Sequence, residues 1–380
     1  MQLTASSFDD AEIRSLRACL ASGWVTQGPV TQEFERLIAA RQKVGHALAA
    51  TSCTAALHLA ALALGLGPGD EVVVPAFTWI TSANCAEYVG AKAVFADIDL
   101  ASFNLDPAAF EEAITPRTKA VVAAHLFGLA APMDEILAIA RHRELVVIED
   151  AACAIGTTYR GRPVGGLGDV GCFSFHPRKI ITTGEGGAVT TNSDTLAKTI
   201  QALRNHGATG LPSPAIEPHG PWTMVTFGAL GHNFRLSDIQ ASVGVAQFAK
   251  LDALLAERRA CALRYSSLLG GISDLVLPTA GVDCAGHTFQ SYVVRLRAGG
   301  RMRRNAVMAT LAAADIQTRP GTHAVHRLGY YREKYRLRPE QFPNAALCED
   351  TTITLPIFPG MTATDQERVA ETLSVGIESA

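Results

Sequence analysis

The sequence has few of the patterns that build metal sites. Its eight cysteines include no Cys-x-x-Cys pair, and none stands at the spacing of a zinc finger. Several lie inside apolar runs, where a thiol behaves as a small hydrophobic group. We therefore expect free thiols, no metal ligands and a reducing compartment, the cytoplasm.

Runs long enough to cross a membrane are also missing. The longest apolar stretch, 55–66, contains His58 and is followed by the turn Gly67-Pro68-Gly69-Asp70, a pattern that predicts a core helix. The first six residues have neither a basic region nor an apolar core. We therefore expect no secretory signal and no membrane partner.

Charge is sparse and evenly spread. Charged residues make up 18% of the chain and the net charge is −3. The one tight basic cluster, Arg301, Arg303 and Arg304, follows two glycines and is typical of a solvated turn. This composition argues against nucleic-acid binding. No Gly-x-Gly-x-x-Gly follows the first strand, which argues against an ordinary nucleotide-binding α/β protein.

What the sequence does contain is an alternation of short apolar strands and helices. The predicted strands of this pattern are 71–75, 92–96, 119–124, 145–148, 171–175 and 187–191. Short β-branched runs that alternate with helices predict an α/β fold, in which a mostly parallel sheet lies between helices.

The length of 380 residues suffices for a large domain and a smaller one. We predict a large domain over 1–250, with an N-terminal helix at 9–22 capped near Ser7, and a small C-terminal α/β domain over 251–380. A long helix over 236–268 is expected to connect them. The elements predicted for the small domain are strands at 291–296 and 315–318 and helices at 305–313 and 365–377.

One lysine lies in an unusual local sequence. Lys179 follows the aromatic run Phe173-Ser174-Phe175 and precedes the turn Gly184-Glu185-Gly186-Gly187, while Asp150 follows the predicted strand 145–148. Pyridoxal phosphate (PLP) chemistry requires a lysine that forms a Schiff base with the aldehyde and an acid that keeps the pyridine nitrogen protonated. Taken alone, Lys179 could be a surface charge, and Asp150 could bind magnesium or a ribose or be structural.

A phosphate site is indicated where a loop becomes a helix. Ser52 or Thr54 can supply a hydroxyl there, and the first free amides of the helix point at an anion. A plain helix N-cap explains the same residues equally well. Ser174 would add a second hydroxyl from the strand before Lys179.

Aromatic and imidazole side chains follow other predicted strands. Trp79 could stack on a flat cofactor ring, although a core tryptophan is the commoner outcome. His125 and His176 could be catalytic, but a hydrogen-bonded structural histidine is more frequent.

Taken together, these residues resemble the sugar aminotransferases of the DegT/DnrJ/EryC1/StrS group, which have the fold type I of aspartate aminotransferase. The resemblance extends from about Gly23 to Met361. The segments that carry it are Thr26-Gln27-Gly28-Pro29, 52–60, 67–72, Glu149-Asp150-Ala151-Ala152, 174–187, Gly231-His232-Asn233-Phe234-Arg235 and Leu355-Pro356.

The resemblance implies a role for each matching residue. Lys179 matches the Schiff-base lysine, Asp150 the partner of the pyridine nitrogen, and Trp79 the aromatic side chain that stacks on the ring. Asn233 matches an asparagine that reaches the phosphate from the neighbouring subunit, which implies a homodimer with shared active sites. The matches to phosphate contacts are Ser52, Cys53, Thr54 and Ser174.

Two cysteines depart from the family pattern. Cys53 stands where glycine is frequent, and a backbone amide contact would survive that change. Cys153 stands where many members carry a glutamine near the ring hydroxyl, and a thiol is a poorer hydrogen-bond partner.

The family transfers an amino group from glutamate, sometimes glutamine, to a keto group on a nucleotide-linked sugar, and some members act on a cyclitol. The resemblance therefore implies a ping-pong aminotransferase that uses PLP and pyridoxamine phosphate (PMP). Thr26, His176, Arg235 and His323 are candidate substrate contacts. Two segments, 207–222 and 319–323, are candidate adjustable walls of the pocket.

Two other functions remain open at this point. A sugar dehydratase of the same fold uses the same cofactor, but members of that type that form no lysine Schiff base carry histidine in place of Lys179. A PLP-binding regulator without enzyme activity would need a DNA-binding segment, and no spare segment or basic face is evident.

Overall fold

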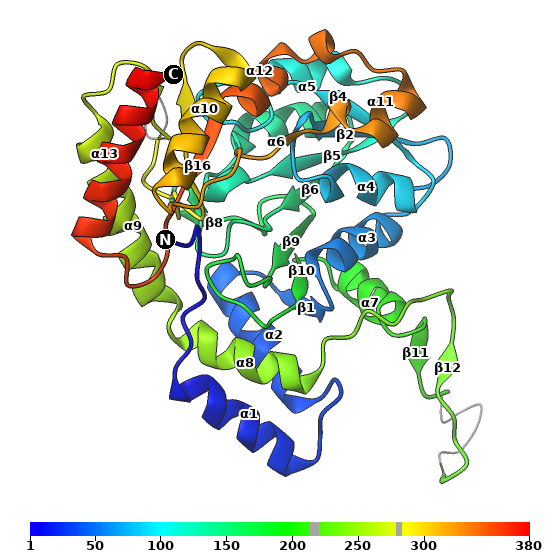
Figure 1. Ribbon diagram of the computed structural model, residues 1–380. Coiled ribbons are helices and arrows are strands. Elements are labelled where there is room, and N and C mark those ends of the chain that lie inside the picture. Colours follow the sequence, from blue (N-terminus) through cyan, green and yellow to red (C-terminus); the bar gives the residue numbers. More distant parts are fainter. Residues whose placement is uncertain (213–219, 279–282) are drawn as a thin grey trace.

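The computed structural model describes residues 1–212, 220–278 and 283–380. A seven-stranded sheet with the order β1-β10-β9-β6-β5-β2-β4 lies at its centre (Figure 1). In this sheet β10 runs antiparallel to its neighbours β1 and β9, and the other neighbouring pairs are parallel. The mostly parallel α/β sheet is thus confirmed. The strands are β1 His46–Ala50, β2 Glu71–Pro75, β4 Lys92–Ala96, β5 Thr118–Ala124, β6 Val146–Asp150, β9 Val170–Ser174 and β10 Gly187–Thr191.

Helices cover both faces of this sheet because successive strand residues point to opposite sides. Val72, Val74 and Ile148 share a core with α3, α4 and α7, whereas Val73 and Val147 share one with α5 and α6. Next to the latter core, α2 and α8 cover β1, β9 and β10. The bounds are α2 Pro29–Gln42, α3 Cys53–Ala63, α4 Thr81–Tyr88, α5 Pro107–Ala113, α6 Met133–His142, α7 Asp194–Leu203 and α8 Asp238–Ala249.

A smaller antiparallel sheet, β13-β14-β16, packs with three helices around a second core that contains Tyr265, Tyr292 and Leu373. The later helices α11 and α12 instead add Tyr331 and Cys348 to the core of the large sheet. Residues 251–380 thus contribute to the core of the small sheet and to a core of the large sheet. A domain boundary at 250 stays a prediction. The bounds are β13 Leu275–Val276, β14 Tyr292–Leu296, β16 Thr352–Leu355, α9 Leu251–Leu269, α10 Gly300–Ala313, α11 Gly329–Tyr335, α12 Pro343–Thr351 and α13 Ala363–Ser379.

Three predicted elements are wrong in detail. The helix predicted at 236–268 breaks at Lys250 into α8 and α9, because the Lys250 amide bonds to Gln247 three residues back. The N-terminal helix α1 (Asp10–Ser22) is capped by Asp9 and not near Ser7. The segment 315–318 is not a strand: Asp315 has a φ of 57°, and β pairing begins only at Arg319, opposite Thr354.

The predicted loop 207–222 lies on a narrow arm. Strand β11 (Ala208–Gly210) pairs with β12 (Thr226–Phe227), and Figure 1 shows this hairpin extending away from the large sheet. Residues 213–219 of the loop lie outside the described residues. The described helices include none that is both long enough and apolar enough to cross a membrane. All eight cysteines are free.

Candidate active site

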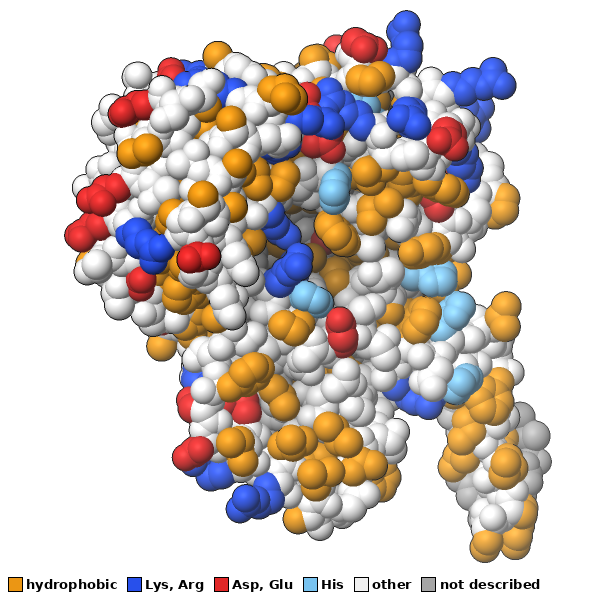
Figure 2. All heavy atoms as spheres, viewed as in Figure 1, with side chains coloured by type: hydrophobic (Ala, Val, Ile, Leu, Met, Phe, Trp, Pro, Cys, Tyr) orange, Lys and Arg blue, Asp and Glu red, His pale blue; other side chains and the backbone are white. Residues whose placement is uncertain are grey.

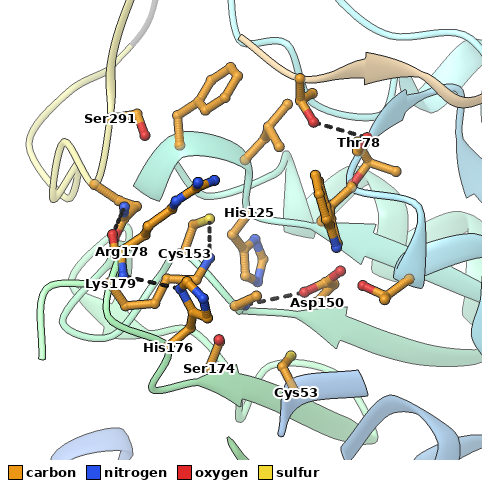
Figure 3. A pocket seen from close by; sticks show the side chains of 18 of the residues that line it. Cys53, Thr78, His125, Asp150, Cys153, Ser174, His176, Arg178, Lys179 and Ser291 are labelled. Atoms are coloured by element: carbon orange, nitrogen blue, oxygen red, sulfur yellow. Dashed lines mark hydrogen bonds between the residues drawn. The ribbon is translucent and has the colours of Figure 1, made fainter. Parts of the chain in front are cut away.

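A cavity of about 370 Å³ lies at the carboxyl ends of β5, β6 and β9, a volume typical of small-molecule sites. Figure 2 shows a hollow in the middle of the molecule, with Lys, Arg and His side chains around it. Figure 3 shows the residues that line the cavity. Those predicted from the sequence are Ser52, Cys53, Thr54, Trp79, His125, Asp150, Cys153, Ser174, His176 and Lys179.

The fold explains why Asp150 points into this cavity. It ends β6 on the same face as Ile148, so its side chain lies on the side of the sheet that carries α3 and α4. Its carboxylate is 6% exposed and accepts hydrogen bonds from the Ser82 hydroxyl, at 2.6 Å, and from the Ala152 amide, at 3.2 Å. A carboxylate can accept about four such bonds. Acceptor capacity is therefore left for a ligand in the cavity.

The neighbouring carboxylate, Glu149, points to the other face and is fully buried. It accepts bonds from the amides of Gly165, Leu167 and Gly168 and from His125 Nε2, at 2.9 Å. Burial alone would raise the pKa of Glu149, but these hydrogen bonds outweigh it and leave the pKa below its ordinary value.

This network also fixes His125. Its Nδ1 accepts from the Ala131 amide, so that nitrogen carries no proton and Nε2 donates to Glu149. The His125 ring is consequently held in one orientation on the floor of the cavity, where Figure 3 shows it.

Lys179 comes from the turn after β9. Among the described residues, its Nζ donates a hydrogen bond to the Cys153 thiol at 3.1 Å (Figure 3) and has no ion-pair partner. Nearby, His176 Nδ1 accepts from the Arg178 amide at 3.1 Å. Burial lowers the pKa of His176 and outweighs the opposing charge of Glu185. A lysine without a carboxylate partner, next to a neutral imidazole, has an amine available for chemistry.

The start of α3 forms a cradle for an anion. Ser52 caps the helix by accepting from the Ala55 amide, and the amides before Ala55 stand at the positive end of the helix dipole. Gly187 of β10 makes this possible, since a Cβ there would lie 2.4 Å from the Ser52 carbonyl carbon. Ser174, on the same sheet face as Asp150, adds a hydroxyl to the cavity.

The opposite wall comes from far along the chain. Strand β15 (His323–Ala324) pairs with β3 (Phe77–Thr78) and brings His323 within 5.7 Å of the Trp79 ring, centroid to centroid. Trp79 is 53% exposed and lines the cavity, whereas His323 lies beside it and is not part of the lining.

Three other predicted residues do not reach this cavity within one chain. The carbonyl of Thr26 accepts from the Asp238 amide, and Asn233 pairs with Asn205. Arg235 donates to the Asn205 side chain. Asn233 is exposed.

Several residues of the site were missed by reasoning from the sequence. Ser82 stands 68 positions from the carboxylate it supports, and Gln290 and Ser291 enter the lining from the segment before β14. Arg178 also lines the cavity, and its place next to Lys179 was the only available signal. Among the described residues, no cluster of three or more His, Cys, Asp or Glu could hold a metal ion.

The arrangement fits a PLP site: an anion cradle, a buried carboxylate with spare acceptor capacity, and an unpaired lysine line one cavity. Residues 6–374 match the model of the DegT/DnrJ/EryC1/StrS aminotransferase family. The chain belongs to this family.

Relatives of this aminotransferase span its whole length. GDP-perosamine synthase of Caulobacter vibrioides is 39% identical over 374 residues, which cover 98% of this chain and 97% of that protein. The spore coat polysaccharide biosynthesis protein SpsC of Bacillus subtilis is 38% identical, and the alignment covers 95% of this chain and 92% of SpsC.

Solved structures agree with the fold. A Streptococcus pneumoniae protein described as a sugar aminotransferase, in its PMP form, superimposes with a TM-score of 0.94 at 28% identity and covers 100% of this chain and 99% of that one. The same protein has been solved in a PLP form. This aminotransferase is therefore a PLP-dependent enzyme of fold type I, as its sequence predicted.

Proposed function

We propose that this aminotransferase moves an amino group from glutamate to the keto group of a nucleotide-linked deoxysugar by a ping-pong mechanism. The observation that supports it is the cavity in which Lys179 and Asp150 face one space beside an anion cradle. The sugar substrate is suggested by the relative named GDP-perosamine synthase. We take a GDP-linked keto sugar as the first candidate, and the cytoplasm as the site of the reaction.

Asp150, Lys179 and the start of α3 would hold the cofactor. Ser52, Thr54 and Ser174 would contact its phosphate through hydroxyls, together with the Cys53 amide. When bound, PLP supplies an aldehyde that accepts the amino group and a ring that takes up the electron pair of the broken Cα–H bond.

Lys179 would move the proton. With its amine free, Nζ would take the proton from the donor's Cα and deliver it to the cofactor carbon that carried the aldehyde. In the second half-reaction Nζ performs the same transfers in reverse order. The Cys153 thiol, 3.1 Å away, would steady Nζ between these positions.

Asp150 would hold its charge against the ring nitrogen. The bonds from Ser82 and Ala152 orient the carboxylate. Trp79 would cover the ring from the wall side, and His176 and His323 would contact substrate.

The active unit would be a homodimer in which Asn233 reaches the partner's phosphate site, with Thr26 and Arg235 near the same interface. Exposed apolar side chains on the arm support this (Figure 2). They are Leu211, Trp222, Met224, Val225, Phe227 and Leu230.

Incubation of the PLP-loaded enzyme with glutamate and keto sugars linked to GDP, UDP or dTDP, read by mass spectrometry, tests the proposal. We expect an amino sugar and 2-oxoglutarate in equal amounts. Loss of a hydroxyl without gain of nitrogen would indicate the dehydratase instead. No conversion of any keto sugar, in an enzyme that still releases 2-oxoglutarate from glutamate, would contradict the sugar substrate.

A further inference from the structure

Two guanidinium groups on the wall of the cavity have no partner among the described residues. They belong to Arg178 and Arg319, which both line the cavity. Arg178 is exposed, whereas the Nε of the half-buried Arg319 is buried without any acceptor. A buried donor left unpaired costs free energy, so this arrangement calls for an explanation.

Three other arginines have side-chain partners, whereas the half-buried Arg295, outside the cavity, has a buried Nε without an acceptor and no side-chain partner among the described residues. Arg204 pairs with Glu35, and Arg327 pairs with Glu349 and Asp350, although the Nε of each is also buried. Arg258, deep in the core, donates to three backbone carbonyls. Arg319 differs from Arg295 in that its unpaired guanidinium lines a cavity that a ligand can enter.

The two free guanidiniums act on each other. Burial, and next the charge of Arg178, lower the pKa of Arg319 below its ordinary value of 12.5. The Cys153 thiol also acts on that pKa, which puts Arg319 close to the residue that contacts Lys179 Nζ. Two like charges near each other, next to the reacting amine, would be relieved by an anion between them.

Their backbones are held in place. The Thr354 amide donates to the Arg319 carbonyl at 2.7 Å, and Gln290 Nε2 donates to the Arg178 carbonyl at 2.8 Å. The remaining charges of the cavity are committed elsewhere, since Asp150 and Lys179 serve the cofactor and Glu185 lies 3.9 Å from His176. The guanidinium charges are thus left for the substrates.

We infer that Arg178 and Arg319 form one oxyanion clamp that both substrates use in turn, the amino donor through a carboxylate and the sugar nucleotide through its diphosphate. This rests on the proposed function, in which one cavity takes both substrates. A planar guanidinium can donate two parallel hydrogen bonds to a carboxylate or to a phosphate. The same two arginines can therefore bind both substrates.

Competition on the PLP-loaded wild-type enzyme tests the clamp without any turnover. Glutarate stands in for the donor, and inorganic pyrophosphate and GDP stand in for the nucleotide, each titrated by calorimetry. We expect glutarate and pyrophosphate to exclude each other. Simultaneous binding of the two would overturn the clamp.

Substitutions add a second readout. We expect Arg319→Gln and Arg178→Gln each to weaken glutarate, pyrophosphate and GDP about 10-fold, as loss of a charge-assisted hydrogen bond should. Arg319→Lys should recover part of the loss for all three. The matched control is Arg141→Gln, on the exposed end of α6, which should leave the affinities unchanged.

If either variant weakened only the carboxylate or only the phosphate ligands, the two substrates would not share the arginines. If the affinities were unchanged in variants that keep the wild-type melting temperature, the clamp would be overturned. The keto-sugar assay is independent of these titrations. If glutarate and pyrophosphate exclude each other but no sugar is aminated, the proposed function alone is rejected. If a sugar is aminated but glutarate and pyrophosphate bind together, the clamp alone is rejected.

Discussion

On the floor of the cavity the polar groups are bonded within the chain, whereas on the wall two guanidiniums are left open. Asp150, on the floor, is oriented by two donors, one of them Ser82, and Glu149, on the other face of the same strand, has four donors. Arg178 and Arg319 have no such partners among the described residues. A floor whose carboxylate is already oriented before any ligand arrives suits a permanent cofactor, and an open wall suits substrates that come and go.

The largest expected effect belongs to Lys179, which stands between floor and wall. Lys179→Ala should lower kcat at least about 10³-fold, because it removes the group that moves the proton. Release of 2-oxoglutarate from glutamate in a single turnover measures this. Lys198→Ala, an exposed lysine of α7, is the control and should be unchanged. Activity of Lys179→Ala within 10-fold of wild type would remove the proposed role.

Asp150→Asn should lower kcat on the order of 10²-fold, because a neutral amide no longer holds the ring nitrogen protonated. Ser82→Ala keeps the charge and loses one of the two orienting bonds, so its effect should stay below 10-fold. Steady-state kinetics of both variants with glutamate measure the difference. Equal losses in the two would mean that orientation, not charge, is what Asp150 contributes.

Glu149→Gln should lower the stability of the fold, in contrast to the preceding variants, which should lower kcat. Replacing a fully buried carboxylate that has four donors should cost about 3 kcal/mol of the free energy of unfolding, measured by urea denaturation at pH 7. The exposed Glu112→Gln on α5 should cost nothing measurable.

The pH dependence of that stability has a definite sign. The pKa of Glu149 in the fold lies below its ordinary value of 4.5, so its contribution is complete above pH 4.5 and is lost as pH falls through the lowered value. Melting temperatures between pH 7 and pH 3 should therefore fall less steeply in Glu149→Gln than in wild type. Parallel curves would show that Glu149 is not ionised in the fold.

The smallest effect is expected at Cys153. A thiol is a weak hydrogen-bond partner, so Cys153→Ala should lower kcat by about threefold, with KM for glutamate unchanged. Cys153→Gln restores the side chain common in the family and tests whether an amide improves on the thiol. A loss above 100-fold in the alanine variant would mean that the thiol takes part in the reaction itself.

The floor could be predicted from the sequence more completely than the wall. Asp150 and Lys179 stand in local sequences that are informative by themselves, at the end of an apolar strand and before a glycine turn. The wall segment 319–323 was predicted only as a whole, without a role for Arg319, and Ser82 supports Asp150 through a contact between distant segments that no local pattern marks. Asn233, Thr26 and Arg235 would act at a contact between two copies of the chain, and such contacts likewise leave no local sequence pattern.

The same contrast holds for the fold. Six of the seven strands of the large sheet were predicted to within two residues because apolar β-branched runs are bounded by turns, whereas β1 was not predicted. The break at Lys250 was missed because the apolar pattern continues through α8 and α9, while a tertiary contact holds Lys250: its Nζ bonds to Asp9 and to the Ser7 carbonyl. The strand at 315–318 failed because the left-handed Asp315 delays pairing until Arg319.

The segment 319–324 is hydrogen-bonded at both ends, to Thr354 of the small sheet and to β3 beside the large one. Six residues of extended chain span at most about 20 Å. A fixed length of backbone thus limits how far Arg319 can lie from Trp79, and so limits the width of the cavity between them. Chains of this family that differ in length here should accept sugars of different bulk.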